Sequence, residues 1–183
     1  MGNAGTLHGA PEVAALLAAA TDLEALGAAV RTHARALAEA QGATFVLREG
    51  DSCFYADEDA MSPLWKGQRF PLIHCITGWA MLNRAVAAVP DIDDDPRVPR
   101  EVYRATFVRS LVAVPIVTRA HDGSAGAAAG AIGVYWDHHR TPSAVLLSRL
   151  QRLAALAGEA MDRIGLDDAP WAPTFFHAAR VTS

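Results

Sequence analysis

The spacing of hydrophobic and polar residues changes twice along the chain. Over residues 23–37 the apolar positions recur at intervals of three and four, which is typical of a helix that buries one side. Over 43–48 and 52–56 the spacing shortens to that of strands, and the polar turn at 49–51 predicts a hairpin. Helical spacing returns over 141–164. The pattern therefore predicts a long helix near each end of the chain, with strands between them.

Residues that favour helix ends support both helices. Thr21 and Glu24 fit a capping box, in which the threonine hydroxyl accepts the backbone N–H of the glutamate and the glutamate side chain reaches back. Gly42 is expected to end this first helix. Thr141 is expected to cap the last helix, with Pro142 in its first turn, where a missing N–H costs nothing.

The middle of the chain alternates short elements with loops. Residues 69–72 predict an edge segment, because Pro71 cannot donate a hydrogen bond to a central ladder. The Gly- and Ala-rich stretch 119–130 is expected to be a flexible hairpin tip. The further elements expected here are a helix at 73–83, a strand at 85–89, an acidic loop at 90–99, a short helix at 100–106 and strands at 110–117 and 131–136.

This order of elements predicts an α+β fold, in which helices gather on one face of a run of antiparallel strands. The sequence has no internal repeat and no second hydrophobic core, so we expect a single domain. Its expected parts are an N-terminal extension or helix over 1–20, the domain with its flanking helices over 21–165, and an irregular C-terminal tail over 166–183.

Composition narrows the classes of function. The 183 residues carry a net charge of −4 and one lysine, Lys66, so a nucleic-acid partner held by phosphate contacts is not expected. The Ala-rich run 13–20 is too short to span a bilayer, and the N-terminus does not resemble a secretory signal. We therefore expect a cytoplasmic protein with no membrane partner. The two cysteines, Cys53 and Cys75, form neither a disulfide framework nor a CxxC motif.

Six short segments resemble the GAF family in their order and spacing. They are Phe70-Pro71-Leu72, Thr77-Gly78-Trp79-Ala80, Val89-Pro90-Asp91-Ile92, Asp95-Pro96-Arg97, Val108 to Ile116, and Ile132-Gly133-Val134. The chain looks most like the GAF domains that lie upstream of bacterial histidine kinases, and the likeness covers most of residues 22–165.

The resemblance implies a central antiparallel sheet with the N- and C-terminal helices together on one face. On the other face it implies short helices and loops that enclose a ligand pocket. Members of the family bind cyclic nucleotides, bilins, haem, small metabolites or ions, so the resemblance implies a sensory role without naming the ligand.

Unusual side chains concentrate between residues 70 and 110, in a part of the chain with little regular structure, where binding groups are commonly held. Aromatic side chains are expected to form the walls of the pocket, and polar ones to orient a ligand. The expected pocket residues are Phe70, Cys75, Trp79, Asp91, Tyr103, Thr106, Arg109 and Ser110.

Several motifs have more than one interpretation. His74-Cys75 could attach a bilin or ligate haem, but its order is reversed relative to bilin-binding GAF domains, so a buried, inert thiol is expected. The acidic run 91–95 lacks the spacing of an EF-hand and is expected to form a turn. Asp137-His138-His139 could bind a metal, but adjacent histidines point to opposite sides of an extended chain. Three arginines could clamp an anion or pair with the acidic run: Arg97, Arg104 and Arg109.

We therefore expect a sensory module that binds a small molecule and catalyses nothing itself. Its expected partners are a second copy, paired through the terminal helices, and a histidine kinase or another signalling protein. One alternative is a dimerisation module without a ligand, which a pocket filled by Trp79 and Phe70 would favour. Another is a small redox enzyme like the methionine sulfoxide reductases of this fold. It requires Cys53 and Cys75 to lie close together, and the chain lacks the third cysteine of those enzymes.

Overall fold

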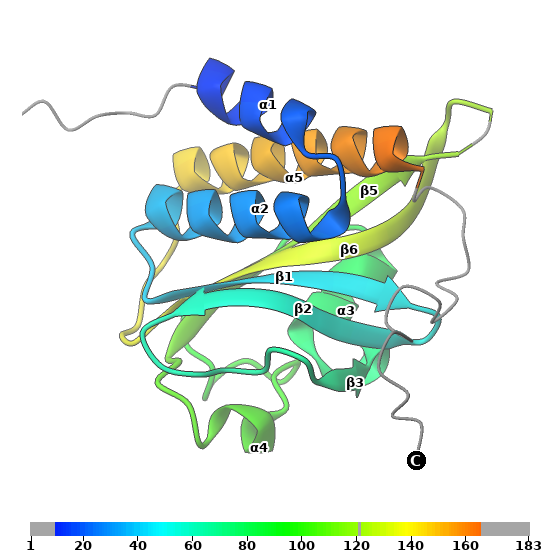
Figure 1. The fold of residues 1–183 in the computed structure, drawn as a ribbon. Coiled ribbons are helices and arrows are strands. Elements are labelled where there is room, and N and C mark those ends of the chain that lie inside the picture. Colours follow the sequence, from blue (N-terminus) through cyan, green and yellow to red (C-terminus); the bar gives the residue numbers. More distant parts are fainter. Residues whose placement is uncertain (1–9, 121, 166–183) are drawn as a thin grey trace, which may run out of the picture.

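The computed structural model describes residues 10–120 and 122–165, which form one six-stranded antiparallel sheet with helices on both faces (Figure 1). The strand order is β3-β2-β1-β6-β5-β4. The strands are β1 (Gly42–Glu49), β2 (Ser52–Ala60), β3 (Arg69–Pro71), β4 (Ala87–Val89), β5 (Ser110–Arg119) and β6 (Ala125–Trp136). The short strand that contains Pro71 lies at an edge of the sheet, as its proline predicts.

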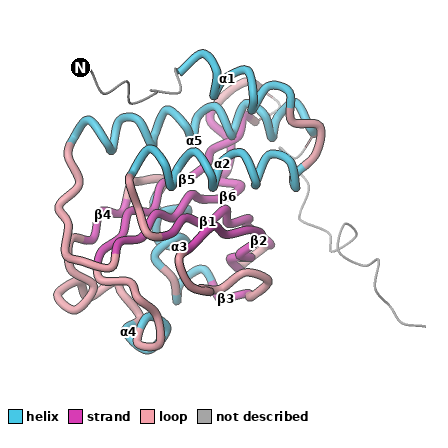
Figure 2. Tube along the Cα trace, turned by 60° about the vertical axis from the view of Figure 1, so that its left-hand side comes forward, coloured by secondary structure: helices cyan, strands magenta, loops and turns pink. Residues whose placement is uncertain are grey.

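The helices divide between the two faces of this sheet (Figure 2). On one face lie α1 (Ala10–Ala19), α2 (Leu23–Ala38) and α5 (Ala144–Ile164). The other face carries the 3-10 helix η1 (Leu72–His74), α3 (Ile76–Asn83) and α4 (Arg100–Tyr103). The predicted α+β fold is therefore confirmed. The N-terminal residues 1–9 and the predicted tail 166–183 lie outside the described residues.

Both long helices start at a different residue from the one predicted. The carboxylate of Asp22 caps α2 by accepting the backbone N–H of Ala25 at 2.8 Å, so the predicted Thr21 capping box is wrong. The hydroxyl of Ser143 caps α5 by accepting the N–H of Leu146 at 3.1 Å, in place of Thr141. In each case a second residue with a capping side chain stands one or two positions further on, where the backbone is extended.

The end of α2 also differs from its prediction. The helix stops at Ala38, because Glu39 adopts a left-handed backbone with φ of 48° and donates its N–H to the carbonyl of Ala36. Gly42 opens β1 instead of ending the helix. A Cβ at Gly42 would lie 3.0 Å from both Ala60 and Phe107, so this glycine serves close packing.

The stretch 119–130 is mostly strand, so the prediction of a flexible hairpin tip is wrong for most of it. Strand β6 begins at Ala125, and its small residues let neighbouring backbone approach closely. A Cβ at Gly130 would lie 2.4 Å from the carbonyl oxygen of Val46 on β1, and one at Gly126 would lie 2.8 Å from that of Thr118 on β5. The Gly- and Ala-rich composition therefore reflects packing inside the sheet.

Two hydrophobic cores lie on opposite faces of the sheet. Alternate residues of β6 point to opposite sides, so Trp136 packs under the helices and Tyr135 faces the other core. On the helix side, Leu26 of α2 and Leu150 of α5 are fully buried. The buried indole of Trp136 donates its N–H to the carbonyl of Ala38, 3.2 Å away, which satisfies the one polar group of its ring.

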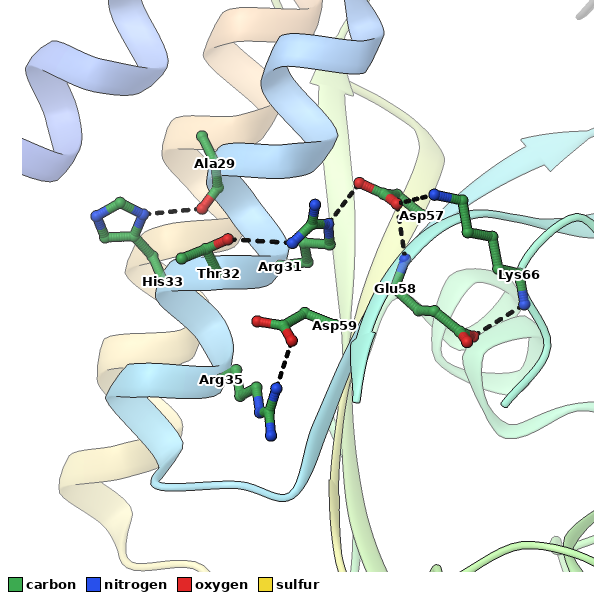
Figure 3. Close-up of polar contacts among 9 residues, drawn as sticks. All are labelled: Ala29, Arg31, Thr32, His33, Arg35, Asp57, Glu58, Asp59 and Lys66. Carbon is green, nitrogen blue, oxygen red and sulfur yellow. Dashed lines mark hydrogen bonds and ion pairs between the residues drawn. The ribbon is translucent and has the colours of Figure 1, made fainter. Parts of the chain in front are cut away.

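Ion pairs attach α2 to strand β2 along one side of the molecule (Figure 3). Arg31 of α2 donates to the carboxylate of Asp57 at 2.5 Å, and Lys66 donates to the same carboxylate at 2.7 Å. One helical turn further along, Arg35 pairs with Asp59. The pairs fix α2 beside β2, where it covers the first of the two cores.

Candidate functional site

The face of the sheet opposite the long helices is filled by an aromatic cluster centred on Trp65. The Trp65 ring meets Tyr55, Tyr103 and Tyr135 edge to face, with ring centroids 5.4, 5.0 and 5.5 Å apart. Phe70 extends the cluster, with its ring 5.6 Å from that of Tyr55. Trp65 is only 4 % exposed although it comes from a loop. Such edge-to-face contacts add to the free energy gained by burying the rings.

The loop that carries Trp65 is held by one carboxylate. Glu58 of β2 accepts the backbone N–H groups of Leu64, Trp65 and Lys66 at 3.0, 2.8 and 2.9 Å (Figure 3 draws the last of these). Hydrogen bonds to a charged acceptor are stronger than those to a neutral one. The side chain of Glu58 therefore fixes the loop that delivers the indole to the cluster.

Tyrosine hydroxyls in the cluster find partners on neighbouring elements. The hydroxyl of Tyr135 lies 3.0 Å from that of Thr44, and the hydroxyl of Tyr55 lies 3.1 Å from that of Thr77. Gly133 makes room for the first pair, because a Cβ there would lie 2.2 Å from the Tyr135 oxygen. Burial raises the pKa of Tyr55 and of Tyr135 above the ordinary range, so both phenols stay neutral near pH 7.

The two cysteines meet beside this cluster. The Sγ atoms of Cys53 on β2 and Cys75 at the start of α3 are 2.7 Å apart, and both thiols are free. Cys53 is fully buried and Cys75 is 6 % exposed. The Thr77 hydroxyl lies 3.7 Å from the Cys53 sulfur and 3.5 Å from the Cys75 sulfur. Cys75 is buried as predicted, but its sulfur lies against a second sulfur.

The two thiols differ in acidity. The hydrogen bond from Cys53 lowers the pKa of Cys75 to about 7, and the Thr77 hydroxyl and the backbone N–H of Gly78 act in the same direction. The same hydrogen bond, together with burial, raises the pKa of Cys53 far above its ordinary value. Cys75 is therefore the sulfur that carries the negative charge when one proton leaves the pair.

Gly78 fixes the position of Cys75. A Cβ at this glycine would lie 1.9 Å from the carbonyl oxygen of Leu72, so only glycine lets α3 pack this closely against η1. The sharp corner between the two helices places Cys75 at the N-cap of α3 and turns its sulfur toward β2. The glycine of the Thr77-Gly78-Trp79 segment, which resembles a family motif, is therefore also required by the close packing of α3 against η1.

A surface cleft of about 310 Å³ opens next to this corner. One wall comes from β3 and η1, and the other comes from the start of α4. Its lining residues are Phe70, Pro71, His74, Pro99, Arg100, Glu101 and Val102. The walls are largely apolar. The guanidinium of Arg100 and the imidazole of His74 supply donors, and the carboxylate of Glu101 supplies an acceptor. The volume is at the small end of the range for ligand sites, about 300–1,000 Å³.

Four of the eight predicted pocket residues lie around the cleft and the cluster. Phe70 lines the cleft and Cys75 directly follows the lining residue His74. Tyr103 is buried against Trp65, and Thr106 donates its hydroxyl hydrogen to the carbonyl of Tyr103 at 2.7 Å. Trp79, also a predicted pocket residue, is partly buried on α3 and faces Arg97, whose guanidinium carbon lies 4.6 Å from the ring centroid.

The other three predicted residues gather at the end of β6. Ser110 is buried and donates its hydroxyl hydrogen to the carbonyl of His138 at 2.7 Å. Asp91 lies 3.3 Å from Nε2 of His139, and Arg109 is exposed while its backbone bonds Ile92 and Trp136. The eight residues therefore lie in separate places, because residues 99–103 return to the cleft and the aromatic cluster while Asp91 and Ser110 lie beside the end of β6.

The charged motifs have structural partners. Arg97 donates to Asp95 through Nε and Nη2, at 2.9 and 2.6 Å, so it takes the ion-pair role that was one of its two interpretations. Arg104 is exposed. Among the described residues, no three His, Cys, Asp or Glu side chains are grouped closely enough to hold a metal ion. None of the described helices has the length and apolar character needed to cross a membrane.

Sequence reasoning missed three residues that build this region. Trp65 appears in the sequence as an isolated aromatic after Pro63, and Glu58 as one acid among several at the end of a strand. Arg100 falls in the short helix expected at 100–106 and has no predicted role there. The sequence offers a signal only for Trp65, because tryptophan is highly buried on average in folded proteins. Nothing in the sequence distinguishes Glu58 or Arg100 from its neighbours.

Comparisons with known proteins agree with this architecture. The family model described as the GAF domain matches residues 22–161, which is most of the chain. No curated protein sequence matches this chain.

Several solved structures share the fold. The GAF domain of a phosphoenolpyruvate-protein phosphotransferase from Acinetobacter has a TM-score of 0.70 at 11 % identity, with 85 % of this chain and 91 % of that chain covered. A free methionine-R-sulfoxide reductase from Neisseria meningitidis has a TM-score of 0.61 at 22 % identity, covering 84 % and 87 %. The GAF-B domain of DevS from Mycobacterium smegmatis has a TM-score of 0.61 at 17 % identity, covering 79 % and 96 %. At identities this low, the structural similarity establishes a shared fold.

Proposed function

Because the chain belongs to the GAF family, we propose that it is a cytoplasmic sensory module of bacterial signal transduction, which binds a small molecule and performs no catalysis itself. The observation that carries the proposal is the cleft between β3–η1 and α4. Its walls rest on the aromatic cluster, since Phe70 packs on Tyr55 and α4 ends at Tyr103. A molecule in the cleft would therefore contact side chains that reach into the core.

The cleft offers apolar walls and places the guanidinium of Arg100 beside the carboxylate of Glu101, and the ligand we propose has an apolar part and an anionic group that binds Arg100. Phe70, Pro71 and Val102 offer apolar surface. Arg100 has five N–H donors, one of which goes to the carbonyl of Asp93. A guanidinium matches a carboxylate in two-point geometry, so a short aromatic or aliphatic carboxylate suits this site.

We further propose that the signal leaves through the helix face. Helices α1, α2 and α5 lie together on the side of the sheet away from α4 (Figure 1). Helical surfaces of this kind can pair two copies in a bundle, which would pass a change to a histidine kinase or another signalling partner. Leu16 of α1 and Val145 of α5 are exposed on these helices and are available for such a contact.

Two measurements test the ligand proposal. Native mass spectrometry of freshly purified protein, with an absorbance spectrum, would reveal a co-purified molecule and the number of subunits. Titration calorimetry with benzoate and a panel of short carboxylates would then measure binding. We expect Arg100→Ala to weaken binding about tenfold or more, which corresponds to about 1.4 kcal/mol. Arg104→Ala, at an exposed arginine just after α4, is the matched control. No co-purified mass and no binding heat with any carboxylate would contradict the proposal.

A ligand-free dimerisation module is a second candidate, and one observation favours it. Trp65, Tyr103 and Tyr135 fill the side of the sheet where the family resemblance implies a ligand pocket. The predicted Phe70 and Trp79 are partly buried against this core, while Trp65, which was not predicted, is its central ring. A protein that stays dimeric at nanomolar concentration, and whose dimerisation no carboxylate alters, would support this candidate.

A Cys-dependent reductase is a third candidate, favoured by the 2.7 Å between the sulfurs of Cys53 and Cys75. Two structures with this fold are free methionine-R-sulfoxide reductases. The test is turnover of free methionine-R-sulfoxide with dithiothreitol as reductant. Measurable turnover that disappears in Cys75→Ser would support an enzyme, and its absence would support the binding module.

A further inference from the structure

The fold brings the sulfurs of the two cysteines into contact. Cys53 and Cys75 are the two cysteines of the chain, and they come from different elements, strand β2 and the N-cap of α3. Their sulfurs lie 2.7 Å apart, and a disulfide bond is about 2.05 Å long. Only a small movement therefore separates the two thiols from a covalent bond.

We propose that Cys53 and Cys75 are a redox site, which a small hydroperoxide converts from a dithiol into an intramolecular disulfide. The site joins β2 to the corner between η1 and α3. The cleft borders the same corner, so a disulfide between the two sulfurs can change the shape of the cleft. The inference rests on the two sulfurs and needs no ligand in the cleft, so a failure of carboxylates to bind would leave it standing.

Cys75 is the sulfur that reacts first. It lies at the N-terminus of an eight-residue helix, where the backbone N–H groups stabilise a negative charge. The hydrogen bond from Cys53 and the hydroxyl of Thr77 stabilise the same thiolate. Cys53 has no exposed surface and follows as the second sulfur.

The reaction balances in two steps. The Cys75 thiolate, whose proton has gone to solvent, attacks one oxygen of the hydroperoxide, so that an S–O bond forms and the O–O bond breaks. The other oxygen takes a proton from solvent and leaves as water from hydrogen peroxide, or as an alcohol from an alkyl hydroperoxide. Cys75 is then a sulfenic acid, and the hydroperoxide has been reduced. The Cys53 sulfur attacks the Cys75 sulfur, the S–S bond forms and the S–O bond breaks. The hydroxide leaves as water with the proton of Cys53.

The burial of Cys75 limits the size of the oxidant that can reach its sulfur. The Cys75 sulfur lies 3.7 Å from the carbonyl oxygen of Pro71 and 3.9 Å from that of Leu72, and only 6 % of the residue is exposed. A protein disulfide or glutathione disulfide must bring its own S–S bond in line with the attacking sulfur, and the small exposed surface of Cys75 leaves little room for so large a group. Hydrogen peroxide and short alkyl hydroperoxides are small enough to enter beside Pro71 and His74, which line the cleft.

The test uses the wild-type protein and hydrogen peroxide. Reduced protein is treated with peroxide, unfolded in excess N-ethylmaleimide and weighed by intact mass spectrometry. We expect a monomer that has lost two hydrogen atoms and takes up no maleimide, and that takes up two after dithiothreitol. Folding holds the sulfurs together, so the disulfide should form at least about tenfold faster in native than in urea-unfolded protein.

Single variants assign the order of the two sulfurs. In Cys53→Ser the Cys75 sulfenic acid has no partner and should be trapped by dimedone that is present while the protein is unfolded. In Cys75→Ser the buried Cys53 should remain a free thiol and react with maleimide after unfolding. Two free thiols in peroxide-treated wild type, disulfides only between chains, or over-oxidation without loss of two hydrogen atoms would each overturn the proposal. Dimedone labelling of Cys53 in Cys75→Ser would overturn the assigned order.

Discussion

The indole ring of Trp65 and the phenol ring of Tyr103 meet edge to face, with centroids 5.0 Å apart and planes at 76°. The contact joins the loop after β2 to the helix α4, which are separated by four other elements in the sequence. It also joins the two sides of the cleft, because Phe70 reaches Trp65 through Tyr55 and Val102 directly precedes Tyr103. The position of the cleft walls therefore depends on one buried ring.

Trp65→Ala should destabilise the protein by about 3–5 kcal/mol, because it leaves a large cavity among rings that pack against it. The measurement is the free energy of unfolding in urea. Ile73→Ala is the control, since Ile73 is 76 % exposed on η1, and the free energy of unfolding should change by less than about 0.5 kcal/mol. A loss below 1 kcal/mol for Trp65→Ala would show that the cluster does not carry this side of the fold.

Glu58→Gln should cost about 1.5–3 kcal/mol, because the amide cannot replace a carboxylate that accepts three backbone N–H groups. Trp65 should also become more mobile, since its loop loses its anchor. Urea unfolding gives the first quantity, and acrylamide quenching of tryptophan fluorescence reports the second. Glu101→Gln, at an exposed glutamate of α4, should alter neither the stability nor the quenching.

The antiparallel fold could be predicted because its signals are local. The hairpin 43–56 shows the spacing of strands over consecutive residues, with a polar turn between them. Pro71 lacks a backbone N–H and is therefore expected only at an edge of the sheet. The capping residues are harder to predict from the sequence, because Thr21 and Asp22 both offer an acceptor oxygen. The backbone conformation decides between them. The prediction for 119–130 is wrong for most of the stretch because small residues occur both in flexible loops and in closely packed strands. Only the contact of Gly130 with β1 distinguishes these.

The candidate site was less predictable because it depends on contacts between distant residues. Cys53 and Cys75 are 22 positions apart, and nothing in that spacing brings their sulfurs together. The corner between η1 and α3 does so, and it depends on the close approach of Gly78 to Leu72. The residues predicted for one pocket were chosen from one stretch of sequence, but Ser110 and Tyr103 bond to different elements.

The ion pair between Asp95 and Arg97 should make stability depend on acidic pH. The hydrogen bond from Arg97 lowers the pKa of Asp95 in the folded protein. A lowered folded pKa stabilises the protein above the unfolded pKa, about 3.9, and this contribution disappears as the pH falls through the folded value. Asp95→Asn should therefore cost about 1 kcal/mol at pH 7 and progressively less below pH 4.

Urea unfolding of wild type and Asp95→Asn between pH 7 and pH 3 measures this difference. Asp94→Asn is the matched control, because Asp94 is the exposed neighbour, and its difference from wild type should stay small over the same range. A cost for Asp95→Asn that is the same at pH 3 and at pH 7 would show that the charge of Asp95 does not contribute.

The acidity of Cys75 should depend on the side chain at position 53. The hydrogen bond from Cys53 lowers the pKa of Cys75 to about 7, so the alkylation rate with iodoacetamide should be half-maximal near that pH. Cys53→Ala removes the donor, and the midpoint should move to higher pH. Cys53→Ser keeps a hydroxyl donor, so its midpoint should stay below that of the alanine variant. Intact mass spectrometry follows the single adduct in both variants, and equal midpoints in the two would mean that the helix N-terminus, and not the neighbouring thiol, sets the acidity of Cys75.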